Sequence, residues 1–173
     1  MKLATRVINF FAPPGSGKST TAAGTFHKMK LMNLNVELVT EFAKDMVWAG
    51  REQEMGNQCY ITAKQFHKMY RLVGKVDYII TDSPLLLGLI YREKDYFPSY
   101  DNFLVEQFNA FTNYNFLLNR VKPFNTRGRL QSEEESDAMK DTFINLLNTH
   151  TPGWETIDGD KKAPDKVLSK LFD

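Results

Sequence analysis

The chain has 173 residues, which is enough for one domain with a sizeable hydrophobic core. Hydrophobic residues make up 42% of it and charged residues 25%, as is typical of a soluble globular protein. The formal net charge of +1 excludes a global field that would draw the protein to nucleic acid or to a membrane, although it permits a local basic groove.

Cysteine usage and apolar patterning indicate the compartment. Cys59 is the single cysteine, so no disulfide forms within the chain and a reducing, cytoplasmic compartment is expected. The N-terminus leads directly into the first predicted strand, so we expect no signal peptide. The longest apolar run, residues 84–91, is too short to span a bilayer. The three histidines lack metal-ligand spacing and are interpreted as surface or packing residues: His27, His67 and His150.

Short apolar runs alternate with helical patterns along the chain. They predict strands at residues 7–11, 36–40, 76–81, 114–118 and 154–157. Helices are expected near residues 18–32, 42–49, 57–73, 84–91, 100–111, 133–148 and 164–172. This order favours an α/β fold in which helices cover both faces of a parallel five-stranded sheet.

Capping signals support several of these boundaries. Ser132 followed by Glu135 predicts a capping box, and Ser83-Pro84 and Ala163-Pro164 place a proline at the first helical position. The chain shows no low-complexity linker and no internal repeat, so a single domain over residues 1–173 is expected.

The stretch between the first strand and the first helix, residues 12–19, reads APPGSGKS and is typical of a phosphate-binding P-loop. Gly15 and Gly17 allow the backbone to curl so that successive N–H groups form an anion nest, to which the following helix adds its dipole. Lys18 can reach the β- and γ-phosphates, and the Ser19 hydroxyl can bind Mg²⁺. The predicted nucleotide-binding residues are Gly15, Ser16, Gly17, Lys18, Ser19 and Thr20.

The P-loop pattern departs from the usual one at its start. Ala12 stands where the first glycine is expected, and Pro13 and Pro14 after it carry no N–H. The donors that bind phosphate come from Gly15 onward, so Ala12 requires only that the end of the strand avoid positive φ. The pattern therefore predicts a three-layer P-loop NTPase sandwich.

Carboxylates follow the next two predicted strands. Glu41 comes after residues 36–40, with Asp45 one helical turn on, and Asp82 ends the run 78–81 as in a Walker B motif. Ligands of open parallel sheets bind beyond the carboxyl ends of the strands, so these side chains should meet the P-loop there. We predict that Asp82 holds Mg²⁺ and that Glu41 is a general base, with Asp82 as the alternative base, while either carboxylate also fits the electrostatics of a helix start.

A segment without periodicity, residues 122–132, carries Lys122, Arg127, Gly128 and Arg129. It predicts a mobile lid in which Arg127 and Arg129 clamp phosphate, because the planar guanidinium suits that geometry. A solvated charged loop is the simpler alternative. Asp158-Gly159-Asp160 follows the last strand at the same rim.

The helix predicted over residues 57–73 has two readings. Its polar face, with Tyr60, Lys64, His67, Lys68 and Arg71, could line an acceptor pocket. The spacing of Ile61, Gln65, Met69 and Val73 is more simply that of a core-facing stripe.

With these motifs the chain resembles small P-loop kinases of the nucleoside and nucleotide kinase type. It is most similar to phage-encoded members and more distantly similar to ribosylnicotinamide kinase domains. The matching segments are residues 9–12, 39–45, 81–84 and 128–131, and they extend over most of the chain. The resemblance implies an ATP- and Mg²⁺-dependent kinase with a short parallel sheet and an arginine-bearing lid, and a cytoplasmic location, in the host if the gene is a phage's.

The resemblance also bears on the acceptor. In deoxynucleoside kinases a glutamate after the second strand acts as base toward the acceptor hydroxyl, and Glu41 is its counterpart here. The Asp-Gly-Phe-Pro signature of nucleoside-monophosphate kinases is replaced by Asp82-Ser83-Pro84. Some related phage kinases phosphorylate 5-hydroxymethyluracil within DNA, so the acceptor stays open between a free nucleoside, a nucleotide and a modified pyrimidine in DNA.

Three functional hypotheses follow. The first is a kinase that moves the γ-phosphoryl group of ATP to a nucleoside- or nucleotide-type acceptor, with Lys18, Glu41, Asp82, Arg127 and Arg129 as catalytic residues. The second is a regulatory or motor ATPase, and the third is a nucleotide-binding module without catalysis, in which Glu41 and Asp82 would be idle. The sequence does not indicate an oligomeric state.

Overall fold

The computed structural model describes residues 2–121, 123 and 132–172. In chain order its strands are β1 (Arg6–Phe11), β2 (Val36–Val39), β3 (Tyr78–Thr81), β4 (Thr112–Asn119) and β5 (Glu155–Asp158). Its helices are α1 (Lys18–Leu31), α2 (Phe42–Trp48), the 3₁₀ turn η1 (Glu52–Glu54), α3 (Gln58–Tyr70), α4 (Leu87–Tyr91), α5 (Tyr100–Asn109), α6 (Glu133–Ala138), α7 (Lys140–His150) and α8 (Ala163–Phe172).

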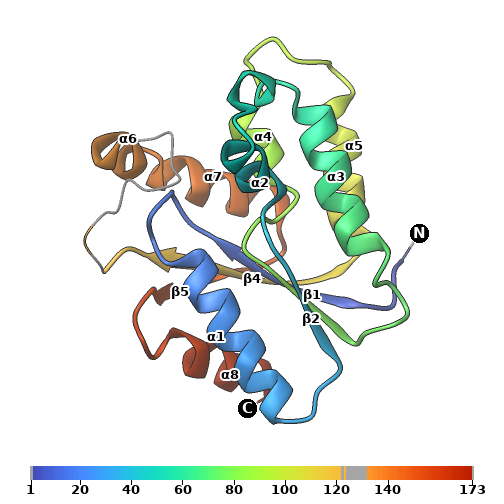
Figure 1. Ribbon diagram of the computed structural model, residues 1–173, viewed down its shortest axis with the longest axis vertical. Helices are drawn as coiled ribbons and strands as arrows, with labels where there is room; N and C mark the ends of the chain where they lie inside the picture. Colours follow the sequence, from blue (N-terminus) through green and yellow to red (C-terminus); the bar gives the residue numbers. More distant parts are fainter. Residues whose placement is uncertain (1, 122, 124–131, 173) are drawn as a thin grey trace.

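The five strands form one parallel sheet in the order β2-β3-β1-β4-β5 (Figure 1). The pairing places Asn9 of β1 between Thr81 of β3 and Asn115 of β4. Because all strands run the same way, their carboxyl ends meet at one edge of the sheet. The segments that follow β2, β3 and β1 are therefore neighbours in space.

Each face of the sheet packs against its own helices, as successive side chains of a strand point to opposite sides. Val7 and Phe11 of β1 belong to the core shared with α3, α5 and α7, whereas Ile8 and Phe10 belong to the core shared with α1 and α8. Figure 1 shows α1 and α8 on one side of the sheet and the other helices on the opposite side. The three-layer fold predicted from the sequence is confirmed.

The helix expected over residues 133–148 is instead two helices, α6 and α7, which meet at Met139. The capping box of Ser132 and Glu135 is confirmed at the start of α6. Two contacts fix α6: Arg120 forms ion pairs with Glu133 and Asp137, and the fully buried Ser136 hydroxyl donates to the Pro14 carbonyl at 2.7 Å. These anchors set a direction for α6 that α7 does not continue.

The two proline signals mark helix starts less closely than expected. Pro84 precedes α4 by three residues, and its carbonyl accepts a hydrogen bond from the Leu87 N–H. Pro164 is the second residue of α8. Elsewhere the predicted helices and strands agree with the structure to within a few residues at each end. In the described part of the chain, no helix combines the length and apolar character needed to cross a bilayer.

Behind the P-loop, the turn after β5 lies directly against the loop backbone. A Cβ on Gly159 would overlap the Ser16 carbonyl oxygen, and a Cβ on Gly17 would lie 3.2 Å from the Gly159 carbonyl oxygen. The Gly159 N–H donates to the Asn119 carbonyl at 2.9 Å, which holds this turn in place. The P-loop therefore rests on a surface that has no side chain.

Gly159→Ala should distort the P-loop and weaken ATP binding by at least about tenfold, because neither backbone can withdraw without breaking its own hydrogen bonds. Isothermal titration calorimetry with a non-hydrolysable ATP analogue measures the effect. Gly153→Ala is the matched control, since an added Cβ there meets nothing within 4 Å. Equal ATP affinity in the two variants would contradict the role of the bare surface.

Candidate functional site

The loop between β1 and α1 has the geometry of an anion nest. Gly15 and Gly17 adopt φ of 84° and 93°, a left-handed conformation that glycine reaches without strain. Gly17 is also the N-cap of α1, and its carbonyl accepts from the Thr21 N–H at 2.9 Å. Ala12 is fully buried, and Asn33 is the one described non-glycine residue with positive φ, so alanine satisfies the start of the loop as expected.

The Lys18 side chain folds back over this loop. Its Nζ donates to the Ala12 carbonyl at 2.6 Å and more weakly to the Pro13 carbonyl at 3.4 Å. The ammonium group therefore lies beside the nest. A bound phosphate oxygen could replace the Ala12 or Pro13 carbonyl as the acceptor of its hydrogen bonds. Ser19 and Thr20 are exposed in the first turn of α1, and both line a cavity that begins at the P-loop.

Asp82 follows β3, the strand between β1 and β2, so it lies between the P-loop and Glu41 along the edge of the sheet. The residue is 4% exposed, and its Oδ1 is buried without a hydrogen-bond partner among the described residues. An ionised oxygen in such a place is costly unless a cation or donor joins it.

This orphaned oxygen fits a bound Mg²⁺. Magnesium in nucleotide sites takes one or two protein oxygens and completes its shell with phosphates and water, so a dense cluster of protein ligands is unnecessary. The described residues accordingly hold no group of three or more acidic, histidine or cysteine side chains. Ser19 and Asp82 are the two residues that would hold the ion.

Glu41 follows β2 as the N-cap residue of α2, and it lines this cavity. Burial raises the pKa of its carboxyl above the ordinary value of 4.5; the Lys18 ammonium opposes this rise, and the charge of Asp82 adds to it. Lys44 also lowers the pKa and Asp45 raises it, both more weakly. A carboxyl with a raised pKa beside a phosphate site is suited to accept a proton.

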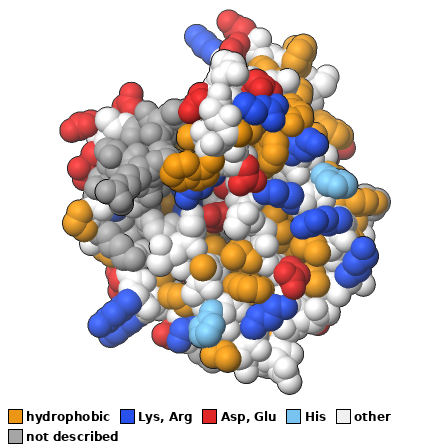
Figure 2. Space-filling model, in the orientation of Figure 1, with side chains coloured by type: hydrophobic (Ala, Val, Ile, Leu, Met, Phe, Trp, Pro, Cys, Tyr) orange, Lys and Arg blue, Asp and Glu red, His pale blue; other side chains and the backbone are white. Residues whose placement is uncertain are grey.

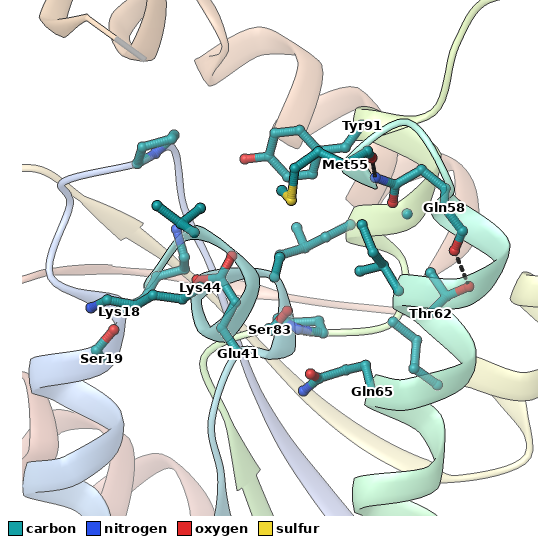
Figure 3. A pocket seen from close by; sticks show the side chains of 18 of the residues that line it. Lys18, Ser19, Glu41, Lys44, Met55, Gln58, Thr62, Gln65, Ser83 and Tyr91 are labelled. Atoms are coloured by element: carbon teal, nitrogen blue, oxygen red, sulfur yellow. Dashed lines mark hydrogen bonds between the residues drawn. The ribbon is translucent and has the colours of Figure 1, made fainter. Parts of the chain in front are cut away.

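One cavity of about 390 Å³ has residues of the P-loop and Glu41 in its lining and extends beyond them. Its end beside Met55, Gln58, Thr62 and Tyr91 is the far compartment (Figure 3). Figure 3 shows Lys18 and Ser19 at one end, Glu41 and Ser83 in the middle, and Gln58, Thr62, Met55 and Tyr91 at the other end. The lining of the cavity also includes apolar side chains, those of Val47, Met55, Ile61, Leu85 and Leu87. A pocket of this size suits a small organic ligand.

Two polar groups stand out in the far compartment. Gln58 is 3% exposed, and its Nε2 donates to the Met55 carbonyl at 2.7 Å. Burial raises the pKa of the Tyr91 phenol, and the charge of Glu41 adds to this, so the phenol stays protonated at neutral pH. The compartment therefore offers neutral hydrogen-bonding groups inside an apolar wall.

The polar face of α3, one of the two readings left open for this helix, lies outside the cavity. Asp45 and Lys68 form an ion pair at 2.9 Å, and Tyr60 packs edge-to-face on Phe42. None of these residues lines the cavity, and Lys64, His67 and Arg71 are exposed on the outer side of α3, where Figure 2 shows basic side chains. Instead the stripe interpreted as core supplies Ile61 and Gln65 to the cavity. Of the two readings left open for that helix, the described cavity is lined by the apolar stripe and not by the polar face.

Part of the predicted site lies outside the described residues. Lys122, Arg127 and Arg129 belong to that part, as does nearly all of the predicted lid. Sequence reasoning missed Gln58, Thr62 and Tyr91, since a buried polar residue in a helix carries no local signal of what it faces. The apolar run 84–91 predicted the helix but did not indicate that it contacts the cavity.

Comparison with known proteins agrees with the observed fold. The sequence matches the family model of an AAA domain over residues 7–161, so the chain belongs to this AAA-domain family. Among curated proteins, none matches the chain at a significant level. A solved structure of deoxyadenosine kinase from M. mycoides, described with products dcmp and a flexible dcdp bound, is similar with a TM-score of 0.56. The two share 15% identity, and the match covers 95% of this chain and 98% of that chain.

Glu41→Gln should make the ligand-free protein more stable at pH 7–8. The folded-state pKa of Glu41 is raised, so its contribution to stability is fully present below about 4.5 and is lost as pH rises through the folded pKa. Glutamine removes the buried charge, so the gain in melting temperature should shrink toward pH 4.5. Asp45→Asn, which breaks a surface ion pair with Lys68, should be neutral or slightly destabilising at pH 7–8. A gain that does not depend on pH would contradict this reading.

Asp82→Asn should lower Mg²⁺-dependent turnover of ATP by roughly 100-fold or more, because a metal contact supplies several kcal/mol of charge stabilisation. Nucleotide binding without metal should change little. Asp77→Asn, at the exposed opposite end of the same strand region, is the control. Magnesium titrations of the three proteins check the result, and coinciding profiles for wild type and Asp82→Asn would exclude a metal role.

Proposed function

We propose that this AAA-domain protein is a kinase that transfers the γ-phosphoryl group of ATP to a hydroxyl on a nucleoside-type acceptor. One observation carries the proposal: the cavity does not stop at the phosphate nest but runs past Glu41 to a far end beside Met55, Gln58, Thr62 and Tyr91. A site that only hydrolyses ATP needs water beyond the γ-phosphate and has no use for the far compartment.

The described residues divide into roles that phosphoryl transfer requires. The nest from Gly15 to Ser19 and the Lys18 ammonium would hold the phosphates and stabilise the negative charge of the γ-phosphoryl group in the transition state. Ser19 and Asp82 would hold Mg²⁺, which neutralises phosphate charge when bound. Glu41 would take the proton of the acceptor hydroxyl and hold its oxygen in line. Arg127 and Arg129 stay predicted phosphate clamps.

The lining of the far compartment favours an uncharged, planar acceptor. Lys44 on α2 is the one cationic residue of the described lining besides Lys18, and the polar groups deeper in are Gln58, Thr62 and Tyr91. A monophosphate would need cations to replace its hydration. A base or nucleoside needs apolar walls and a few neutral hydrogen-bonding groups, which this compartment has.

The family description favours a second candidate, an ATPase that drives a partner, because the matching model is that of an AAA domain. The two functions differ in what limits ATP consumption. A kinase should consume ATP slowly until its acceptor is added, whereas a motor or regulatory ATPase should respond to a macromolecular partner. A non-catalytic nucleotide-binding module would consume none under either condition.

A transfer screen with ATP labelled in the γ-phosphate tests the proposal. The acceptors are nucleosides, nucleoside monophosphates, ribosylnicotinamide, and DNA with and without 5-hydroxymethyluracil. Label on a hydroxyl acceptor that depends on Mg²⁺ supports the proposal. Release of inorganic phosphate alone, unchanged by every acceptor, would overturn it in favour of the ATPase.

Glu41→Gln separates hydroxyl from phosphate acceptors. With a hydroxyl acceptor, loss of the base should lower kcat by roughly 10²–10⁴, the usual worth of a positioned general base. With a monophosphate acceptor, which is already anionic, the same change should alter mainly KM. Asp45→Asn is again the control, since Asp45 faces Lys68 and not the cavity. A loss in kcat below tenfold with a hydroxyl acceptor would remove Glu41 from the mechanism.

A further inference from the structure

Helix α3 holds the residues on both sides of Glu41. The Lys68 ammonium donates to the Thr40 carbonyl at 3.2 Å, and the Phe42 N–H donates to Gln65 Oε1 at 3.0 Å. Glu41 itself makes no side-chain cap to its own helix α2. The Lys68 and Gln65 contacts therefore hold the backbone on both sides of Glu41.

The other end of the Gln65 amide reaches the strand that leads to Asp82. Its Nε2 donates to Thr81 Oγ1 at 3.3 Å, and the same hydroxyl oxygen accepts from the Ser83 N–H at 3.0 Å. A backbone N–H can only donate, so Phe42 fixes the amide oxygen on its side and leaves the amide nitrogen for Thr81. The orientation of the Gln65 amide follows from its partners.

The bridge is sheltered from water. Gln65 is 4% exposed and Thr81 is fully buried, whereas an ordinary surface hydrogen bond competes with solvent. Thr81 is also fixed by its strand, because β3 pairs with β1 on one side and with β2 on the other. Gln65 thus connects the start of α2 to a rigid part of the sheet.

The two carboxylates flanking the bridge carry like charges when ionised, and the charge of Asp82 raises the pKa of Glu41. Such groups move apart unless the backbone restrains them. Phosphoryl transfer needs them at a constant separation, because one orients the acceptor and the other the phosphate side. A buried bridge between their chain neighbours supplies that restraint.

We propose that Gln65 and Thr81 are positioning residues, and that the bridge Phe42 N–H···Gln65···Thr81···H–N Ser83 couples the Glu41 turn to the Asp82 turn. In its catalytic consequence the proposal rests on the proposed kinase function. The coupling itself is a property of the ligand-free protein and can be measured without an acceptor.

Three variants break or restore the bridge. Thr81→Val removes the hydroxyl with almost no change of shape, Thr81→Ser keeps it, and Gln65→Met removes the amide. Thr81 does not line the cavity, so its variants leave the acceptor wall unchanged. Thr25→Val is the matched control, because Thr25 in α1 is equally buried and its hydroxyl has no hydrogen-bond partner among the described residues.

Amide hydrogen exchange, followed by NMR on the ligand-free protein, tests the coupling. In Thr81→Val the Phe42 amide should exchange at least about tenfold faster although its own acceptor is intact, and Thr81→Ser should restore its protection. In Gln65→Met the Ser83 amide should respond in the same indirect way. Wild-type exchange of the remote amide in both variants, or equal acceleration in Thr25→Val, would overturn the bridge.

Kinetics with the acceptor found in the screen test the positioning role. Thr81→Val should lower kcat by roughly 10- to 100-fold, as expected for a displaced catalytic group, while the affinity for an ATP analogue stays within about twofold. The double variant Gln65→Met/Thr81→Val should be no worse than the poorer single variant, since both break one bridge.

Each outcome decides one of the two proposals. Freed amides with unchanged kcat would overturn the positioning role, and additive losses in the double variant would show two separate effects in place of a bridge. A wild-type protein that phosphorylates no acceptor would refute the kinase function, and the exchange data would then still support or overturn the coupling.

Discussion

The nucleotide site depends on backbone packed against backbone where the P-loop meets the turn after β5. A Cβ on Gly159 would overlap the Ser16 carbonyl oxygen and a Cβ on Gly17 would crowd the Gly159 carbonyl, while Gly15 and Gly17 adopt the positive φ that turns the N–H groups inward. The last strand of the sheet thus supports a loop that follows the first. Ser136 adds a third support through its hydrogen bond to the Pro14 carbonyl. The phosphate nest is preorganised by segments distant in sequence.

Charge placed at the same edge of the sheet opposes folding. Asp82 buries an oxygen without a partner among the described residues, and burial raises the pKa of Glu41. Both arrangements cost stability in the ligand-free state, and under the proposed function phosphate, metal and acceptor would offset that cost. The hydrophobic cores on the two faces of the sheet offset this cost, which is why the reactive groups can sit on strand ends and helix starts without unfolding them.

Features encoded locally were predictable from the sequence. The P-loop, the alternation of strands and helices along the chain and the positions of Glu41 and Asp82 at strand ends follow from short patterns and from the rule that parallel strands share one carboxyl edge. The acceptor compartment was not predictable, because it exists only where α2, α3 and α4 meet. Gln58 and Gln65 have the spacing of core residues, and their roles appear only with their partners. The break at Met139 likewise depends on tertiary anchors of α6.

Helix α3 combines a locally encoded pattern with roles that only its tertiary contacts reveal. Ile61 contributes to the wall of the cavity, Gln65 bridges the two catalytic turns, and Lys68 holds the Thr40 carbonyl on the outer side. One helix thereby contributes to the cavity wall and holds the backbone on both sides of Glu41, whereas the P-loop belongs to β1, α1 and the turn after β5. Substitutions that reshape the acceptor wall through Gln58 or Ile61 can therefore alter what binds there without disturbing the phosphate nest, provided that the contacts of Gln65 are kept.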